Sequence, residues 1–187
     1  MSCYKALNNQ EYSLKEYSIV PIRLEDRMDI MKWRNEQIYH LRQDRPLTKK
    51  DQDYYFDNVI SNLFSQKQPN QLLFSFLDND VCIGYGGLVH INWVDKNAEI
   101  SFIMDTQLEK EAFQKHWINY LQLIERVAFN ELSFHKIFTY AFDLRPKLYI
   151  ALEKVNFKKE AVLKEHCFFD GKYKDVVIHS KFNLFKI

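Results

Sequence analysis

Hydrophobic and polar positions alternate along some stretches of the chain and recur every three or four residues along others. Alternation predicts strands at 17–24, 71–78, 81–93, 97–105 and 135–142. Helical spacing predicts helices at 24–38, 46–66, 109–131 and 146–155, and a hairpin fills 157–182. The resulting order, β-α-α-β-β-β-α-β-α-β-β, indicates a mixed α/β domain.

Local signals support several of these boundaries. Thr48 is a good N-cap for the second helix, and Asp170-Gly171 is a pair typical of a tight hairpin turn. The pairs Asp78-Asn79 and Asp95-Lys96 separate the three central strands, which therefore form an antiparallel meander.

Composition limits the partners and the compartment. The chain has 187 residues, enough for one core, and residues 1–17 lack a clear period, so we expect an N-terminal extension followed by one domain at 18–187. A net charge of +1 favours a small-molecule partner over nucleic acid or an anionic membrane. No apolar run is long enough to span a bilayer, and we expect a cytoplasmic protein with three reduced cysteines.

Four stretches in this order resemble the GNAT superfamily of acyl-CoA-dependent N-acyltransferases. They are MKWRNEQ (31–37), IGYGGLVHINWVDKNAEISFIMD (83–105), AFNELSFHKIFTYAF (128–142) and ALEKVNFKKEAVLKEHCFFDGKYKDVVIHSKF (151–182). The resemblance is greatest to the branch of ribosomal-protein N-terminal acetyltransferases and nucleotide-amino-sugar acetyltransferases. It implies a twisted, mostly antiparallel sheet flanked by helices, with one parallel strand pair that splays apart around acetyl-CoA.

The resemblance also places the cofactor. Pantetheine should pair with the backbone near Ile103 and Met104, and the pyrophosphate should lie at the next helix N-terminus. The family motif Gln/Arg-x-x-Gly-x-Gly/Ala falls on 107–112, where Gln107 and Ala112 match but Lys110 replaces the central glycine. Lysine restores charge yet adds bulk, so the alternative is an ordinary strand-to-helix junction.

Acetyl transfer to an amine requires a base and a proton source for the departing thiolate. By resemblance, Glu99 is the candidate base, and its alternative is a solvent-facing carboxylate. Leu152 occupies the position of the family tyrosine, so Tyr149, one turn earlier, is the candidate donor unless it is structural. Arg145 replaces a family asparagine and could bind a CoA phosphate or remain a solvated charge.

Two groups of residues are candidates for the acceptor side. The first group, given by the resemblance, is Trp33, Arg34 and Asn35. The second group, His90, Asn92 and Trp93, lies on the facing strand and offers an aromatic ring beside an amide. Trp33 could equally be a core residue. No grouping of His, Cys and Asp has metal-ligand spacing, and we expect no metal.

Together these features predict an acetyl-CoA-dependent N-acetyltransferase acting on a primary amine. The resemblance slightly favours an amino sugar, free or nucleotide-linked, as acceptor over a protein N-terminus, and it allows a homodimer. The alternative from another class is a noncatalytic GNAT-like binding module, which the altered glycine, tyrosine and asparagine positions would fit.

Overall fold

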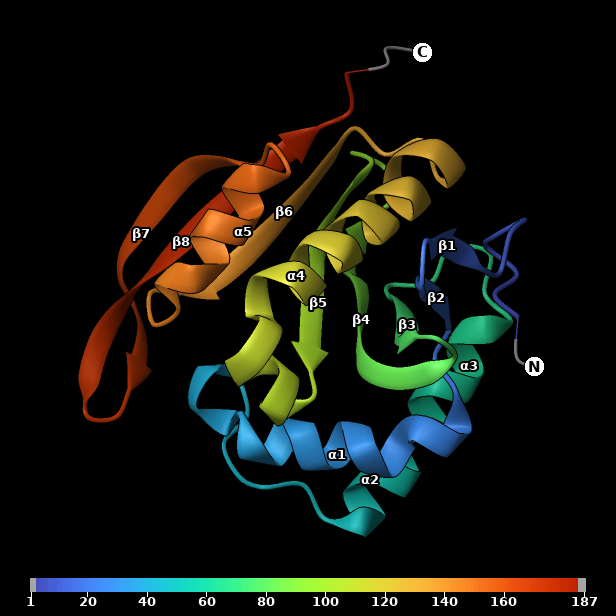
Figure 1. The fold of residues 1–187 in the computed structure, drawn as a ribbon, viewed down its shortest axis with the longest axis horizontal. Coiled ribbons are helices and arrows are strands. Elements are labelled where there is room, and N and C mark those ends of the chain that lie inside the picture. The colour runs from blue at the N-terminus through green and yellow to red at the C-terminus, as the bar shows by residue number, and fades with distance from the viewer. Residues whose placement is uncertain (1–2, 185–187) are drawn as a thin grey trace.

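One twisted sheet organises the computed structural model, which describes residues 3–184 (Figure 1). Within this range all neighbouring strands are antiparallel except one central pair. In sheet order the strands are β1 (Tyr12–Leu14), β2 (Tyr17–Pro21), β3 (Leu72–Asp78), β4 (Val81–Asn92), β5 (Asn97–Met104), β6 (Lys136–Phe142), β8 (Lys172–Phe182) and β7 (Lys158–Phe169).

The parallel pair, β5 and β6, is joined at one end only. Its register covers Asn97↔Lys136, Ala98↔Ile137 and Glu99↔Phe138, beyond which the two strands no longer pair. The strands therefore diverge after Glu99, as their ribbons show (Figure 1). The expected splayed pair in a mostly antiparallel sheet is confirmed.

The helices are α1 (Arg27–Glu36), α2 (Lys49–Tyr55), α3 (Ser61–Phe64), α4 (Thr106–Glu125) and α5 (Pro146–Lys154). Short 3-10 turns at Leu24–Asp26 and Ile38–His40 flank α1. The helix expected at 46–66 is one helical run in which the π-helical stretch Phe56–Ile60 separates α2 from α3. A second π-helical stretch, Arg126–Glu131, ends the run that begins with α4.

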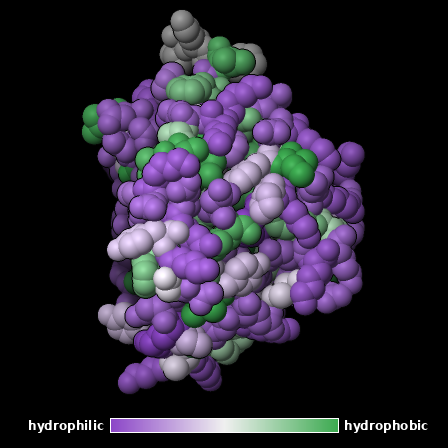
Figure 2. All heavy atoms as spheres, turned by 90° about the vertical axis from the view of Figure 1, so that its left-hand side faces the viewer, coloured by the Kyte–Doolittle hydropathy of each residue, from purple (hydrophilic) through white to green (hydrophobic). Residues whose placement is uncertain are grey.

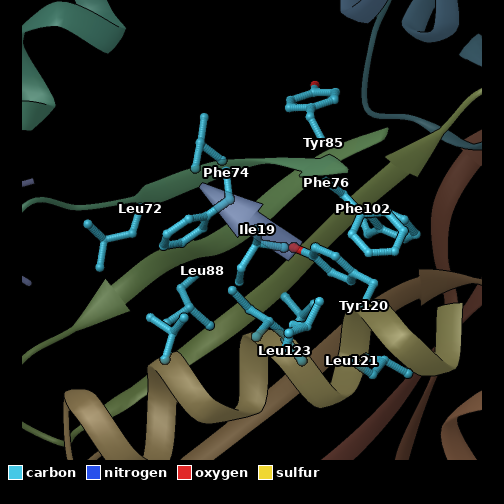
Figure 3. Packing of buried hydrophobic residues seen from close by; sticks show 14 of the residues in the cluster. Ile19, Leu72, Phe74, Phe76, Tyr85, Leu88, Phe102, Tyr120, Leu121 and Leu123 are labelled. Atoms are coloured by element: carbon cyan, nitrogen blue, oxygen red, sulfur yellow. The ribbon is translucent and has the colours of Figure 1, made fainter. Parts of the chain in front are cut away.

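The main core lies between the sheet and α4 (Figure 3). The ring of Tyr120 stacks on that of Phe102 with centroids 3.8 Å apart, and Phe76 meets both edge-on. Tyr85 points to the other face of the sheet (Figure 3), as expected because successive strand residues alternate. One face of the sheet therefore packs against α4 in the main core, and the opposite face of β4 carries Tyr85.

The N-terminal segment is packed into the domain. Tyr4 is 1% exposed, and its hydroxyl donates to the carbonyl of Leu73 and accepts from the Leu73 amide. Residues Tyr12–Leu14 add the edge strand β1, for which the sequence showed no period. The segment 3–17 therefore contributes to the sheet and the core, while residues 1–2 lie outside the described range.

Most predicted boundaries agree with the structure to within three residues. Thr48 caps α2 through a reciprocal pair of bonds with Asp51, and Asp170 and Gly171 form the β7–β8 turn with positive φ. Helix α4 begins at Thr106 rather than 109 because Asp105 caps it.

On the side of the molecule that carries the β7–β8 hairpin, hydrophobic areas of the surface are separated by hydrophilic residues (Figure 2).

Candidate functional site

A cleft of about 120 Å³ opens where β5 and β6 diverge. Its walls come from the segment after α1, from the two splayed strands and from the helices behind them. The residues that matter below are His40, Arg42, Glu99, Phe102, Tyr140 and Arg145.

The β5 backbone offers hydrogen-bonding groups to this cleft. The Asp105 amide donates to the Ile83 carbonyl of β4, and two residues earlier Ile103 lies opposite Tyr85. Because the direction of the backbone amide alternates along a strand, the amide and carbonyl of Ile103 also face β4. Those of Phe102 and Met104 face the opening. The Met104 carbonyl already accepts from the Gln37 side chain at 2.7 Å. Of the two residues expected to pair with pantetheine, Met104 has backbone groups that face the opening, whereas those of Ile103 face β4.

Glu99 lies at the apex of the opening, where the β5–β6 pairing ends. Its side chain is only 8% exposed, so it is not a solvent-facing carboxylate. Arg42 Nη2 donates to Oε1 at 2.6 Å, and His90 Nδ1 lies 2.8 Å from Oε2. The Arg42 guanidinium also lies over the Tyr140 ring, 4.7 Å from its centroid. The structure thus joins residues from a loop and three strands at one carboxylate.

A second charged group lies near the N-terminus of α4. Arg145 Nη2 donates to Glu109 Oε1 at 2.9 Å, and both side chains are 12% exposed. Arg145 Nε and Glu109 Oε2 are buried without a hydrogen-bond partner in the structure. Burial lowers the pKa of Arg145, while the Glu109 carboxylate acts in the opposite direction. Arg145 is therefore a cleft residue rather than a solvated charge.

His40 lies beside this pair. Its Nδ1 is 3.2 Å from Arg145 Nη1, a geometry in which the guanidinium donates to a neutral ring. Burial first, and then the charge of Arg145, lower the pKa of His40 to about 3. The ring is thus neutral at physiological pH.

The expected pyrophosphate loop has a different structure from a glycine-rich one. Asp105 Oδ1 accepts from the amides of Gln107 and Leu108, so a carboxylate of the chain itself already occupies this helix end. Ala112 interrupts α4 with φ −137° and ψ 31°, which separates 106–111 from the rest of the helix. Lys110 borders a cavity of about 430 Å³ that Glu109 and Arg145 also line. The Gln107 side chain bonds Glu111.

The structure places Tyr149 outside the cleft lining. Its hydroxyl donates to Asp143 at 2.8 Å, and its ring stacks on His179. Burial and the Asp143 carboxylate both raise the pKa of Tyr149. The phenol that does line the cleft is Tyr140 on β6.

The acceptor candidates are divided among several places. Trp33 is buried, and its Nε1 donates to Asp105, which is a core role. Asn35 bonds the Leu47 amide and carbonyl and fixes the loop before α2. His90 reaches Glu99, as described above, and Arg34 borders a separate cavity. Asn92 accepts from the amides of the turn after β4, and Trp93 Nε1 donates to the Pro69 carbonyl.

Sequence reasoning missed Arg42, His40, Glu109 and Tyr140. His40 ends the short 3-10 turn Ile38–His40 and Arg42 lies in the loop that follows, and neither belongs to a hydrophobic period. Glu109 resembled an ordinary acidic residue in a first helical turn. Only Tyr140 had a local signal, because it lies on the predicted strand that borders the splay. The site contacts of Arg42, His40 and Glu109 join residues that are 36 to 105 positions apart in the sequence, so no local pattern indicated them.

The residues present fit a CoA thioester. The opening offers strand backbone to an extended chain, and buried Arg145 Nε lacks a partner, as a group awaiting an anion would. Among the described residues, no group of three or more His, Cys, Asp or Glu side chains could hold a metal ion. No helix within 3–184 is both long and apolar enough to cross a membrane.

Comparisons with known proteins agree with this architecture. Residues 19–178 match the model of the acetyltransferase (GNAT) domain. Spermidine N(1)-acetyltransferase of Vibrio cholerae serotype O1 is 29% identical over 104 residues, which cover 54% of this chain and 58% of that enzyme's length.

Solved structures share the fold at lower identity. The spermidine N-acetyltransferase of Vibrio cholerae in complex with CoA and spermine has a TM-score of 0.77 and 20% identity, covering 91% of this chain and 97% of the other. A dodecameric structure of that enzyme in an intermediate state has a TM-score of 0.70 and 22% identity, covering 91% and 95%. Because the family model spans nearly the whole splayed sheet and its helices, the chain belongs to the acetyltransferase (GNAT) domain family.

Proposed function

We propose that this protein is an acetyl-CoA-dependent N-acetyltransferase that acetylates a primary amine. The observation that carries the proposal is the opening between β5 and β6 with the Glu99 carboxylate at its apex. A thioester that enters this opening would meet strand backbone on one side and a carboxylate near its reactive end. Family membership supports the same reaction.

Three parts of the cleft would hold the cofactor. The amides of Phe102 and Met104 face the opening and would pair with pantetheine as an added strand does. Arg145 offers a guanidinium to a phosphate, and Lys110 lines the adjoining cavity. Acetyl-CoA supplies the activated acetyl group; the chain orients it and removes the proton of the amine.

The base is the pair formed by Glu99 and His90. The imidazole is 64% exposed, and its Nδ1 lies against Glu99, which favours the tautomer with the proton on Nδ1. Nε2 would then take the proton from the amine, either directly or through water. Arg42 holds the other carboxylate oxygen and so fixes the orientation of the pair.

The proton for the departing thiolate is assigned to Tyr140 in place of Tyr149. Tyr140 lines the cleft, and burial raises the pKa of its phenol, which therefore remains protonated. The hydroxyl of Tyr149 is already bound to Asp143. Tyr149→Phe is consequently a matched control for Tyr140→Phe.

The acceptor is proposed to be an amine of low positive charge, with an amino sugar as first choice. Among the described residues that line the cleft there are two arginines, Arg42 and Arg145, but one carboxylate, Glu99, which Arg42 already binds, and the Tyr140 ring adds an aromatic surface. Spermidine is the second candidate, favoured by the names of the relatives. A polycation would encounter Arg42 beside Glu99, which counts against it.

The test is a release assay for free CoA with matched acceptors: glucosamine, its phosphorylated form, spermidine and a short peptide with a free N-terminus. We expect turnover with one class of amine, and a loss of ~10²–10⁴-fold in Glu99→Gln and His90→Gln without a matching change in CoA affinity. Asn92→Ala, on the same strand as His90, should leave turnover unchanged. Calorimetry that detects no CoA binding would refute the proposal and favour a binding module.

A further inference from the structure

The largest of the cavities described lies away from the cleft. It has a volume of about 650 Å³ and lies between α1, the α2–α3 helical run and the face of the sheet to which Tyr85 points. This size is within the range of small-molecule sites, about 300–1,000 Å³. Its apolar and aromatic lining consists of Ile22, Ile30, Leu47, Tyr54, Tyr55, Phe56, Val59 and Tyr85.

Arg34 lines this cavity with a charge that no carboxylate neutralises. Nη1 donates to the Tyr85 hydroxyl at 2.8 Å, and Nε donates to the Gln43 side chain at 3.1 Å. Within residues 3–184, no carboxylate lies within 4 Å of this guanidinium, whereas Arg23, Arg27, Arg42, Arg45 and Arg145 each have an acidic partner there. Arg34 therefore combines partial burial with a missing counter-charge.

The acidic residue of the cavity lining is already bound by other groups. Asp51 lines it, but its carboxylate is bound by Arg45 and by the Thr48 amide and hydroxyl at the cap of α2. The neighbouring Tyr85 raises the pKa of Arg34 against the effect of burial, so the guanidinium stays charged. Lys50 adds a second cation at the rim. The lining therefore has two cations, Arg34 and Lys50, that are not paired with Asp51, and most of its other residues are apolar or aromatic.

A half-buried guanidinium held by neutral groups is costly unless an anion meets it. The same group is a strong, planar donor for carboxylate or phosphate oxygens. The π-helical stretch supplies Phe56 and Val59 to the wall, and such stretches are frequent at functional sites.

We infer that this cavity is a second binding site, which takes a small organic anion whose carboxylate or phosphate binds Arg34 and whose apolar or aromatic body fills the pocket. The site does not depend on acetyl transfer. The same chemistry could belong to a free ligand or to the distal end of an acceptor, because Tyr85 and Glu99 lie on the same face of neighbouring strands.

The test uses phenyl phosphate and hexanoate as anionic probes, with benzyl alcohol and hexanol as neutral counterparts. Binding is followed by calorimetry and by ring signals of the cavity tyrosines in NMR spectra. Wild-type protein should bind an anionic probe, and Arg34→Gln should weaken it more than tenfold. Lys32→Gln removes the same charge from the exposed face of the same helix and should change the affinity less than twofold.

Two outcomes would overturn the inference: equal affinity for neutral and anionic probes, or equal loss in Arg34→Gln and Lys32→Gln. Arg34→Lys provides a check on folding, because it keeps the charge and should retain part of the affinity. Acetyl transfer in the presence of the probe then identifies the source. If the probe competes with the amine, the cavity is an acceptor subsite; if the kinetics are unchanged, the cavity binds a separate ligand. Probe binding is measured without CoA, so its result does not depend on whether the proposed function is correct.

Discussion

Replacing Glu109 by glutamine should strengthen CoA binding, although it removes an ion pair. Glu109 bonds the Arg145 guanidinium, and one oxygen of the carboxylate and the Nε of the arginine are buried without partners. In the proposed complex, Arg145 turns to a phosphate, and Glu109 competes with that phosphate for the same cation. Glutamine keeps the shape of the side chain but not the charge.

The size of the effect follows from the bond that is released. A hydrogen bond to a charged group contributes about 1.5–3 kcal/mol net. Since about 1.4 kcal/mol corresponds to a factor of ten, the dissociation constant of CoA should fall about 10- to 100-fold. Without CoA the variant should be less stable than the wild type, because Arg145 loses the charge that offsets its burial.

Calorimetry with CoA and thermal unfolding with and without CoA measure the two opposite effects. Glu111→Gln is the control, because it removes the same charge from the exposed side of the same helical segment and should change affinity less than threefold. If Glu109→Gln weakens CoA binding or leaves it unchanged, Glu109 does not compete with the cofactor. The assignment of Arg145 to a phosphate would then be wrong.

Three further predictions concern affinity, pH and packing. Lys110→Glu should weaken CoA binding, whereas an unchanged Kd would mean that the pyrophosphate does not lie on this segment. The folded-state pKa of His40, about 3, lies below its ordinary value of about 6.5, so the stability that neutral His40 contributes is present above pH ~6.5 and is lost as the pH falls toward 3. His40→Asn should therefore reduce the slope of the unfolding free energy against pH, between pH 6.5 and 4, by up to ~1.4 kcal/mol per pH unit, as measured by urea titrations. Gly86→Ala would place a methyl group 2.0 Å from the Ser101 carbonyl oxygen and should cost about 3 kcal/mol or more, at the upper end of overpacking costs. Gly171→Ala meets no atom within 4 Å and should cost only the ~1–2 kcal/mol of its positive φ, so equal losses in chemical denaturation would contradict the packing argument.

The comparison of expectation with structure is clearest at Glu99. Its position on a strand beside the cofactor opening could be predicted by resemblance, and the strand and the opening are confirmed. Its partners could not, because Arg42 lies 57 positions away in a loop without hydrophobic period. His90 was a candidate for another role, since its distance from Glu99 depends on the bulge between Val89 and Asn92.

The motif at 107–112 shows the same limit. The sequence contained Asp105 directly before the helix, a good N-cap, and the structure uses it in that way. The inward-facing Glu109 carboxylate binds Arg145, which the packing of α5 against α4 brings near, and the kink at Ala112 has no signal in the local sequence. A local pattern could identify the helix but not the direction of one of its charges.

By itself the sequence determined the order and type of the elements, since periods of two and of about 3.6 residues reflect one buried face and are local properties of the chain. It also determined the Thr48 cap and the Asp170-Gly171 turn, which involve neighbours within three residues. The tertiary structure alone decided which charges meet at Glu99 and Arg145, that Tyr4 completes the core, and that Arg34 lines a cavity in which no carboxylate of the described residues pairs with it. Those features depend on how strands and helices far apart in sequence are packed together, and hydrophobic periodicity fixes which face of an element is buried but not which polar group it will meet.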